Sequence, residues 1–206
     1  MSRAAATAVT VQRLEPAQAS QTVALLEALR VSLFGIQSRR LHDMLVGDAV
    51  ARRIDCRIAL ASDGVCGVVL AAPRSYWTSA LLTHWSVAFD CVRARLSARR
   101  HPRAPGSSPA IAHAAAPSVG DDAGPPPRTW ANPGDAWRII VVGTAPAARG
   151  RGVAADLYRA MMRDRSLVAR IAADNHASIR LHRSVGWRLY PDGEVVLAVH
   201  ERRPAA

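Results

Sequence analysis

Hydrophobic and polar positions in the first quarter of the chain change from the spacing of a strand to the spacing of helices. Val9–Leu14 alternates like a short strand, and Glu15 and the following proline end it. Apolar residues then recur at helical spacing over Ala19–Phe34, where Gly35 is the expected end. Ser38–Arg52 is predicted as a second helix. This region therefore predicts one strand followed by two helices.

The rest of the pattern outside one long interruption predicts strands and helices in alternation. Arg57–Ala61 and Val65–Ala71 flank a Ser-Asp-Gly turn, which is typical of a hairpin. The later expected elements are a strand over Ala136–Gly143, a helix from Val153, a strand over Leu167–Ala173, a short helix containing Ser178–Val185 that Gly186 stops, and two last strands, Trp187–Tyr190 and Val195–His200, joined at Pro191-Asp192-Gly193. Together these elements predict one α/β (α+β) domain over residues 1–206.

Residues 73–135 are predicted to be an insertion with two parts. Apolar residues form one helical stripe over about residues 76–98, and arginines follow it. Pro, Ala, Gly, Ser and Asp dominate about residues 102–133, which predicts a flexible loop. The helix is expected to pack on the domain. A lid over the acceptor site, a homodimer contact and a contact of the 76–103 segment with a membrane surface are the alternatives.

Composition is that of a chain with a sizeable core. Half of the 206 residues are hydrophobic. No stretch reaches the roughly 18 uninterrupted apolar residues of a membrane span, and no secretion signal is apparent, so we expect a cytoplasmic location. Cys56, Cys66 and Cys91 form no C-x-x-C pair, and the histidines lack zinc spacing. Neither a disulfide framework nor a metal site is expected.

The net charge of +11 raises the question of nucleic-acid binding. All 27 basic residues are arginine, and they are spread along the chain rather than gathered in one stripe. Aromatic residues are few and do not alternate with the arginines, as a platform for single strands would require. We therefore expect no nucleic-acid partner, although the charge favours polyanionic cofactors.

The segment Arg149–Ala154 has the most informative position in the chain. Two closely spaced glycines lie between a predicted strand and a predicted helix, where unpaired N–H groups and the helix dipole attract an anion. The pattern is no G-x-G-x-x-G, and without any lysine the chain has no P-loop lysine. The segment predicts a backbone cradle for an anionic cofactor; an ordinary strand-to-helix turn is the alternative.

Two blocks of sequence resemble the GNAT superfamily of acyl-CoA-dependent N-acetyltransferases. Arg149-x-x-Gly152-x-Ala154 is similar to the Q/R-x-x-G-x-G/A motif of that superfamily. The block from Asn175 to Trp187 is similar to N-x-x-A/S-I-x-L-Y-x-x-x-G-F and is closest to the branch of the phosphinothricin acetyltransferases. The resemblance implies a mixed, mostly antiparallel central sheet with helices on both faces.

The resemblance also implies a cofactor, acetyl-CoA, and the residues that hold it. The strand that ends near Val142 should diverge from its neighbour and pair its backbone with the pantetheine arm. Arg180 and Arg183 are candidates for the 3′-phosphate, with a solvated helix face as the alternative. The implied cofactor residues are Val142, Gly143, Thr144, Arg149, Gly150, Arg151, Gly152, Val153, Ala154, Ala155 and Asn175.

His182 stands where the family commonly has a tyrosine that protonates the leaving thiolate. An imidazole with a pKa near ~6.5 is a candidate general acid, and orienting the thioester is the alternative role. The general base has no carboxylate candidate inside the predicted cofactor strand. Candidates elsewhere are Asp135, Asp174, His42 and Asp43. A backbone N–H near residues 142–144 is expected to stabilise the oxyanion.

The implied function is acetyl-CoA-dependent N-acetyl transfer by direct attack of the primary amine of a small molecule. A protein N-terminus or lysine is an alternative acceptor. A catalytically silent protein that binds acyl-CoA or associates with a membrane is a further alternative.

Overall fold

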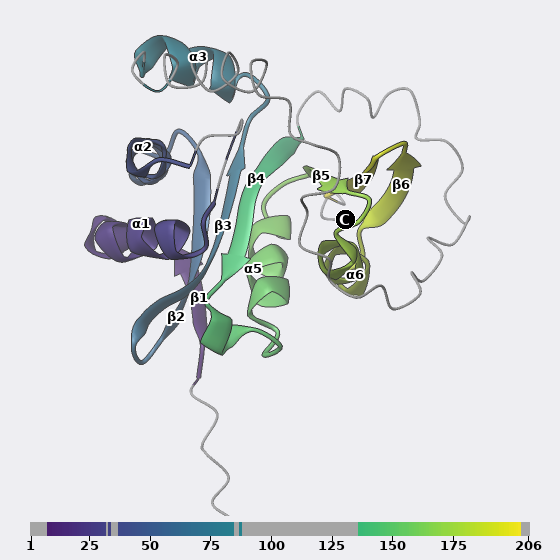
Figure 1. The fold of residues 1–206 in the computed structure, drawn as a ribbon, viewed down its shortest axis with the longest axis horizontal. Coiled ribbons are helices and arrows are strands. Elements are labelled where there is room, and N and C mark those ends of the chain that lie inside the picture. Colours follow the sequence, from purple (N-terminus) through teal and green to yellow (C-terminus); the bar gives the residue numbers. More distant parts are fainter. Residues whose placement is uncertain (1–7, 32, 34–36, 85–86, 88–135, 203–206) are drawn as a thin grey trace, which may run out of the picture.

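A seven-stranded sheet with helices on both faces forms the described part of the chain (Figure 1). The computed structural model describes residues 8–31, 33, 37–84, 87 and 136–202. The strands are β1 (Thr10–Arg13), β2 (Asp55–Ala61), β3 (Gly64–Ala72), β4 (Trp137–Thr144), β5 (Leu167–Ala172), β6 (Arg188–Asp192) and β7 (Val195–His200). They follow one another in the order β1-β2-β3-β4-β5-β7-β6, and every neighbouring pair is antiparallel except β4–β5. The predicted mixed, mostly antiparallel sheet is confirmed.

The helices divide between the two faces of the sheet. The α-helices are α1 (Ala19–Ala28), α2 (Arg39–Val50), α3 (Tyr76–Thr83), α5 (Val153–Met162) and α6 (His176–Ser184), and the 3-10 helices are η1 (Pro16–Gln18) and η3 (Pro146–Ala148). Helices α1 and α2 cover one face, and α5 and α6 cover the other (Figure 1). None of the helices in the described ranges is long and apolar enough to cross a membrane.

Alternating side chains of the central strands fill two separate cores. On β3, Val68 and Leu70 pack toward α1 and α2, whereas Val69 and Ala71 pack toward α5. This alternation with period two is why a strand buried on both faces reads as a continuous apolar run. The central strand β3 is thus covered by helices on both faces.

Two predicted boundaries and the predicted inserted helix differ from the structure. Helix α1 ends six residues earlier than expected, because Arg30 adopts a left-handed conformation (φ 51°) and its N–H bonds to the Glu27 carbonyl. The Val31 N–H then closes on the Leu26 carbonyl. Gly35, the expected end, lies outside the described residues. The last turn also differs, since β6 continues through Asp192 and the chain reverses after it, at residues 193–194.

The predicted helix over about residues 76–98 is interrupted at His84. Helix α3 ends at Thr83, and His84 has a non-helical conformation. Its start is held by Asp48 of α2, which accepts a 2.7 Å hydrogen bond from the Tyr76 hydroxyl and a 2.8 Å bond from Arg53. Val87 is helical and buried in the core on the α1–α2 side of the sheet. The other residues of the predicted helix after His84 and the predicted loop at 102–133 lie outside the described residues.

Gly67 of β3 provides a test of how closely α5 must approach the sheet. A Cβ at this position would lie 2.8 Å from Val153 Cγ1 and 3.1 Å from Leu157 Cδ1. Gly67→Ala is therefore expected to lower the free energy of unfolding by about 1–3 kcal/mol, as overpacking does, in a denaturant titration. Gly47→Ala on α2, where nothing lies within 4 Å of the new Cβ, is the control. That change should stabilise the protein by about 0.5–1 kcal/mol, and equal losses for both variants would contradict the packing explanation.

Candidate functional site

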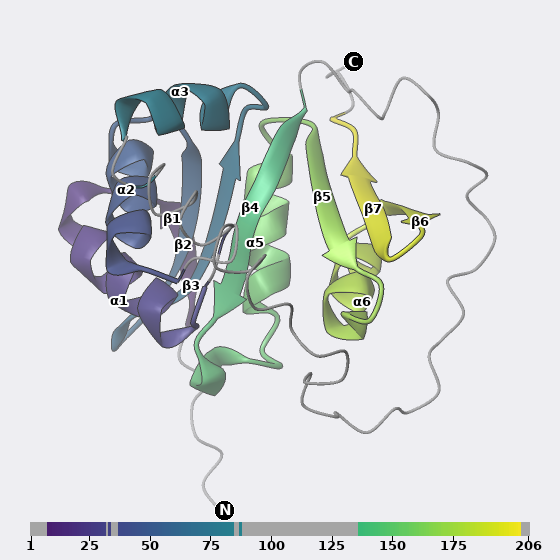
Figure 2. The same cartoon turned by 45° about the horizontal axis from the view of Figure 1, so that its top comes forward.

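Strands β4 and β5 separate soon after they begin, and the opening between them is the central feature of the site (Figure 2). Their parallel pairing joins only Trp137 to Leu167 and Arg138 to Val168. On its other edge, β4 stays paired with β3 as far as Thr144. From residue 139 onward, the β5-facing edge of β4 therefore pairs with no described strand. The predicted divergence of the cofactor strand is present.

A β-bulge in β4 accounts for the opening. Ala71 of β3 pairs with Ile139 and Leu70 pairs with Val141, so Ile140 is an extra residue on β4. A bulge bends its strand and increases the local twist. Because the bulge comes two residues after the last β4–β5 pair, it turns the rest of β4 away from β5. The sequence gives no sign of it, since Ile139–Val142 is an unbroken run of β-branched residues.

The two glycines of the predicted cradle both adopt left-handed conformations at the start of α5. Gly150 has φ 72° and Gly152, the N-cap of α5, has φ 81°. A Cβ at either position would have nothing within 4 Å, so the backbone there is open to a ligand. The glycine N-cap supplies no side-chain oxygen to the first N–H groups of the helix. Those groups and the positive end of the helix dipole are suited to bind a phosphate.

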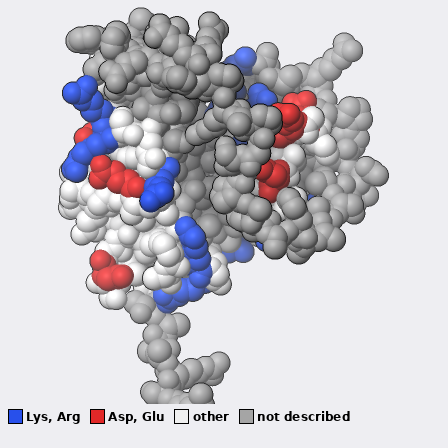
Figure 3. All heavy atoms as spheres, in the orientation of Figure 1, with Lys and Arg blue, Asp and Glu red and all other residues white. Residues whose placement is uncertain are grey.

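Charge at this loop has the sign that a phosphate requires. Arg149 and Arg151 are exposed on either side of Gly150. Figure 3 shows basic side chains at the end of the molecule where this loop lies in Figure 1. Asp156, the acidic residue in the first turn of α5, is paired with Arg159 at 2.7 Å, which offsets its repulsion of an anion.

Several solved structures of acetyltransferases have the same arrangement of elements. The N-acetyltransferase of Staphylococcus aureus Mu50 is 12% identical over 96% of this chain and 100% of its own, with a TM-score of 0.55. A GNAT-family acetyltransferase of Bacillus cereus is 10% identical over 96% and 99%, with a TM-score of 0.55. The GNAT-family N-acetyltransferase YhbS of Escherichia coli, solved with CoA, is 12% identical over 98% and 86%, with a TM-score of 0.52.

The chain has the GNAT fold. No protein-family model and no curated protein matches the sequence. At 10–12% identity the likeness to these three structures concerns the fold alone. The roles of the site residues therefore depend on the geometry of this chain.

The cofactor residues that the sequence predicts fall into three groups in the structure. Val142, Gly143 and Thr144 form the last part of β4, beside the opening. At Gly143, a Cβ would meet Leu29 Cδ1 at 2.5 Å, so the glycine lets the end of α1 lie against β4. Residues 149–155 form the loop and first turn of α5. Asn175 caps α6, and its Oδ1 accepts a 3.1 Å bond from the Ser178 N–H, a role that sequence reasoning missed.

His182 lies buried on α6, with only 1% of its surface exposed. Its Nδ1 lies 2.7 Å from the Ser178 carbonyl oxygen, which can only accept, so the proton sits on Nδ1. The imidazole packs between the rings of Tyr158 and Trp187, at centroid distances of 4.8 and 4.7 Å. Burial lowers the pKa of His182 below its ordinary value of 6.5, and the hydrogen bond to Ser178 opposes that shift.

The lowered pKa decides which hydrogen-bonding groups the His182 imidazole offers at neutral pH. At neutral pH the imidazole is mostly uncharged, its single N–H points at Ser178, and Nε2 carries a lone pair. A general acid needs a proton to give away. The acid role of His182 stays a prediction. It requires a proton on Nε2, and the resulting charge is unfavourable because the ring is buried.

The predicted general-base candidates are not brought together. Asp174 is exposed in the turn before α6. Asp43 is exposed on α2 and lies 3.9 Å from Arg39. His42 is buried on α2, on the face of the sheet opposite to α5 and α6. Its Nε2 donates a 2.9 Å hydrogen bond to the Val31 carbonyl. Asp135 lies outside the described residues. The identity of the base stays a prediction.

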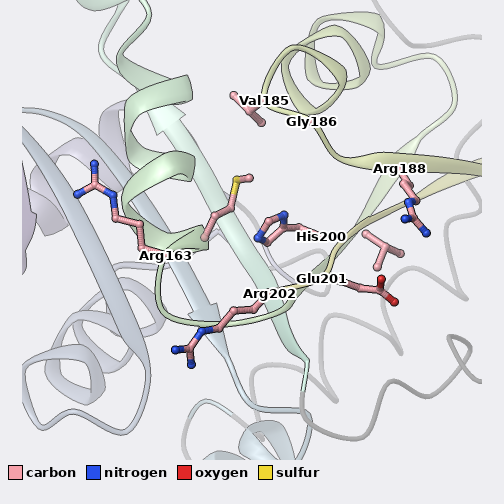
Figure 4. Close-up of a pocket in the computed structure, with 9 residues that line it drawn as sticks. Arg163, Val185, Gly186, Arg188, His200, Glu201 and Arg202 are labelled. Carbon is pink, nitrogen blue, oxygen red and sulfur yellow. The ribbon is translucent and has the colours of Figure 1, made fainter. Parts of the chain in front are cut away.

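A pocket of about 440 Å³ lies at the far end of α5 from the cradle. Met162, Arg163, Gly186, His200 and Arg202 are among its lining residues. Figure 4 shows that the labelled arginine side chains point away from one another. Burial lowers the pKa of His200 as well. The pocket therefore presents no convergent set of charges, and we place the candidate site at the opening instead.

Burial of His182 predicts a pH dependence of stability. Because its folded pKa is below 6.5, the unfolded chain binds a proton at a higher pH than the folded chain. The free energy of unfolding should thus fall as the pH falls through 6.5, until the folded pKa is reached. His182→Phe should reduce this loss in denaturant titrations, with His200 retaining part of it. Leu181→Phe is the control and should keep the wild-type slope; an unchanged slope for His182→Phe would contradict the burial effect.

Proposed function

We propose that the protein is an acetyl-CoA-dependent N-acetyltransferase that transfers the acetyl group to the primary amine of a small molecule. One observation carries the proposal: an unpaired edge of β4 leads directly to a double-glycine loop at the N-terminus of α5. A cofactor with a pyrophosphate and an amide-bearing arm needs these two binding surfaces in this order. The solved structure of E. coli YhbS with CoA has the same fold and supports this choice of cofactor.

The proposed binding mode uses mainly the backbone. N–H groups of residues 150–155 hold the pyrophosphate, and Arg149 and Arg151 add charge beside it. The pantetheine arm extends along β4 past Thr144, Gly143 and Val142 as an additional strand does. Its amides pair with the N–H and C=O groups that β5 leaves without a partner. This backbone pairing fixes the depth of the thioester without any particular side chain.

The reaction that this arrangement favours is direct attack on the thioester. The amine nitrogen forms a bond to the acetyl carbon, the carbonyl oxygen becomes an oxyanion, and the C–S bond then breaks. In this proposal a backbone N–H of residues 142–144 stabilises the oxyanion, because no described strand pairs with that edge of β4 there. An alkyl amine with a pKa near ~10 must first lose a proton, for which His42, Asp43, Asp135 and Asp174 stay candidates. One domain with residues 73–135 as an insertion is part of the same proposal.

Release of free thiol from acetyl-CoA, followed with a panel of acceptors, tests the proposed activity. Small primary amines should accelerate release on the order of a hundredfold over the reaction without protein. Peptides with a free N-terminus or an internal lysine form the second arm. Acceleration by peptides alone would replace the small-molecule acceptor by a protein. Tight binding of acetyl-CoA without acceleration by any amine would indicate a catalytically silent protein.

Gly152→Glu tests the cradle. The variant places a carboxylate and a strained left-handed residue where the pyrophosphate should lie, so calorimetry should detect no binding of acetyl-CoA. Gly193→Glu is the matched control, because Gly193 also has a positive φ (61°) and open space, in the turn between β6 and β7. The control should bind acetyl-CoA as the wild type does. Unchanged affinity of Gly152→Glu would contradict the cradle.

A further inference from the structure

A carboxylate is buried at the end of the sheet where β4 and β5 are still paired. Asp55, the first residue of β2, has a side chain that is only 3% exposed. Its Oδ2 lies 2.9 Å from a guanidinium nitrogen of Arg165, in the segment that joins α5 to β5. Arg57 of β2 and Arg13 of β1 approach Oδ1 at 3.4 and 3.5 Å. One carboxylate therefore ties β1 and β2 to the segment that leads into β5.

Arg165 extends this set of contacts to the start of β4. Its guanidinium lies over the indole of Trp137, with Cζ 3.9 Å from the ring centroid. Trp137 is the first residue of β4 and one of the two that pair with β5. Its N–H donates a 3.0 Å hydrogen bond to the carbonyl of Ser166, the residue after Arg165. We call Asp55, Arg165 and Trp137 the hinge cluster, because they meet where β4 and β5 begin side by side (Figure 2).

The charges of the hinge cluster contribute little to stability. Both carboxylate oxygens of Asp55 and Nε of Arg165 lack an aligned hydrogen bond among the residues described, so the 2.9 Å contact is an ion pair only. Burial lowers the pKa of Arg165, although Asp55 and Asp164 oppose that shift. Apolar side chains of similar volume would be at least as stable in such a place. What the ion pair does provide is a fixed distance between segments of three different strands.

The junction that the hinge cluster holds is the base of the opening. Strands β4 and β5 pair only at their first two residues and diverge from there. β5 in turn carries β7 and β6, to which α6 is attached. The angle at which β5 leaves β4 therefore sets the separation along the whole opening. Small displacements of this kind, far from the reacting atoms, are enough to weaken binding of a ligand that must fit between two walls.

We propose that Asp55 is a positioning residue for the acyl-CoA arm: through Arg165 and Trp137 it fixes the angle between β4 and β5, and with it the width of the opening. The inference rests on the proposed acetyltransferase function and deepens it. Asp55 touches neither the cofactor nor the reacting atoms, and its contribution is to the affinity for the cofactor rather than to the chemical step.

Two variants of the hinge cluster test the proposal. Asp55→Asn removes the carboxylate and leaves the neighbouring arginines with less compensation. Asp55→Asn/Arg165→Met removes one charge of each sign and keeps an apolar side chain against Trp137, so it guards against a single variant that does not fold. Calorimetry should show the Kd for acetyl-CoA raised about tenfold in both, with a raised KM and a nearly unchanged kcat. Arg165→Met alone should give the same loss, since the two residues act as one unit.

Asp48→Asn is the matched control. Asp48 of α2 is also a buried carboxylate, with a side chain 4% exposed and an ion pair of 2.8 Å to Arg53. Its replacement should lower the stability to denaturant as Asp55→Asn does, and it should leave the Kd for acetyl-CoA unchanged. An equal loss of affinity in Asp48→Asn would mean that lower stability alone weakens binding, and the positioning role would be overturned.

Hydrogen exchange of the Trp137 amide tests the junction without any cofactor. Because this N–H bonds to the Ser166 carbonyl, NMR should find it exchanging faster in both hinge-cluster variants than in the wild type and in Asp48→Asn. If the double variant binds acetyl-CoA as tightly as the wild type, the positioning role is overturned and the proposed function stands. If the wild type binds no acetyl-CoA, both are overturned.

Discussion

The incomplete pairing of β4 is the constraint on which the rest of the site depends. A strand in the middle of a sheet normally satisfies its backbone on both edges, and β4 does so on the β3 edge throughout. On the β5 edge, the described strands pair with only its first two residues. Ile140, the bulged residue, makes this geometry stable by bending β4 away while the two cores hold the strands in place. Among the described strands, the fold thus leaves a row of backbone groups of β4 without a strand partner.

The helices are placed so that this opening has a charged end and a dry end. At one end α5 begins with Gly152 and exposed arginines, which suits a hydrated pyrophosphate. Further along α5, Tyr158, His182 and Trp187 form an aromatic cluster between α5 and α6. Hydrogen bonds are stronger where water is excluded, so the proposed acyl transfer is favoured near this buried cluster. Polarity therefore falls along the direction that an acyl-CoA arm would take.

The sequence predicted the features that depend on neighbouring residues and missed those that depend on contacts between distant segments. Order and boundaries of the strands depend on local alternation, and the hairpin and the Gly186 stop follow from neighbouring residues. The bulge at Ile140 depends instead on the register with β3, which no local pattern encodes. Helix α1 ended early at Arg30, although arginine seldom adopts a positive φ. Sequence reasoning did not single out Tyr158, because the burial of its hydroxyl without a partner among the described residues is a property of the folded core.

The proposed cofactor site is built mainly from backbone groups, and this explains why a short stretch of sequence predicts it. The cradle and the edge of β4 use backbone groups, whose placement needs only two glycines, a helix start and a strand, so a short motif is enough. Across the sheet, His42 fixes the Val31 carbonyl, and Asp48 joins α2 to Tyr76 at the start of the inserted helix. These contacts are made by side chains from distant segments. Contacts of this kind depend on residues that lie far apart in the sequence, so no short motif marks them.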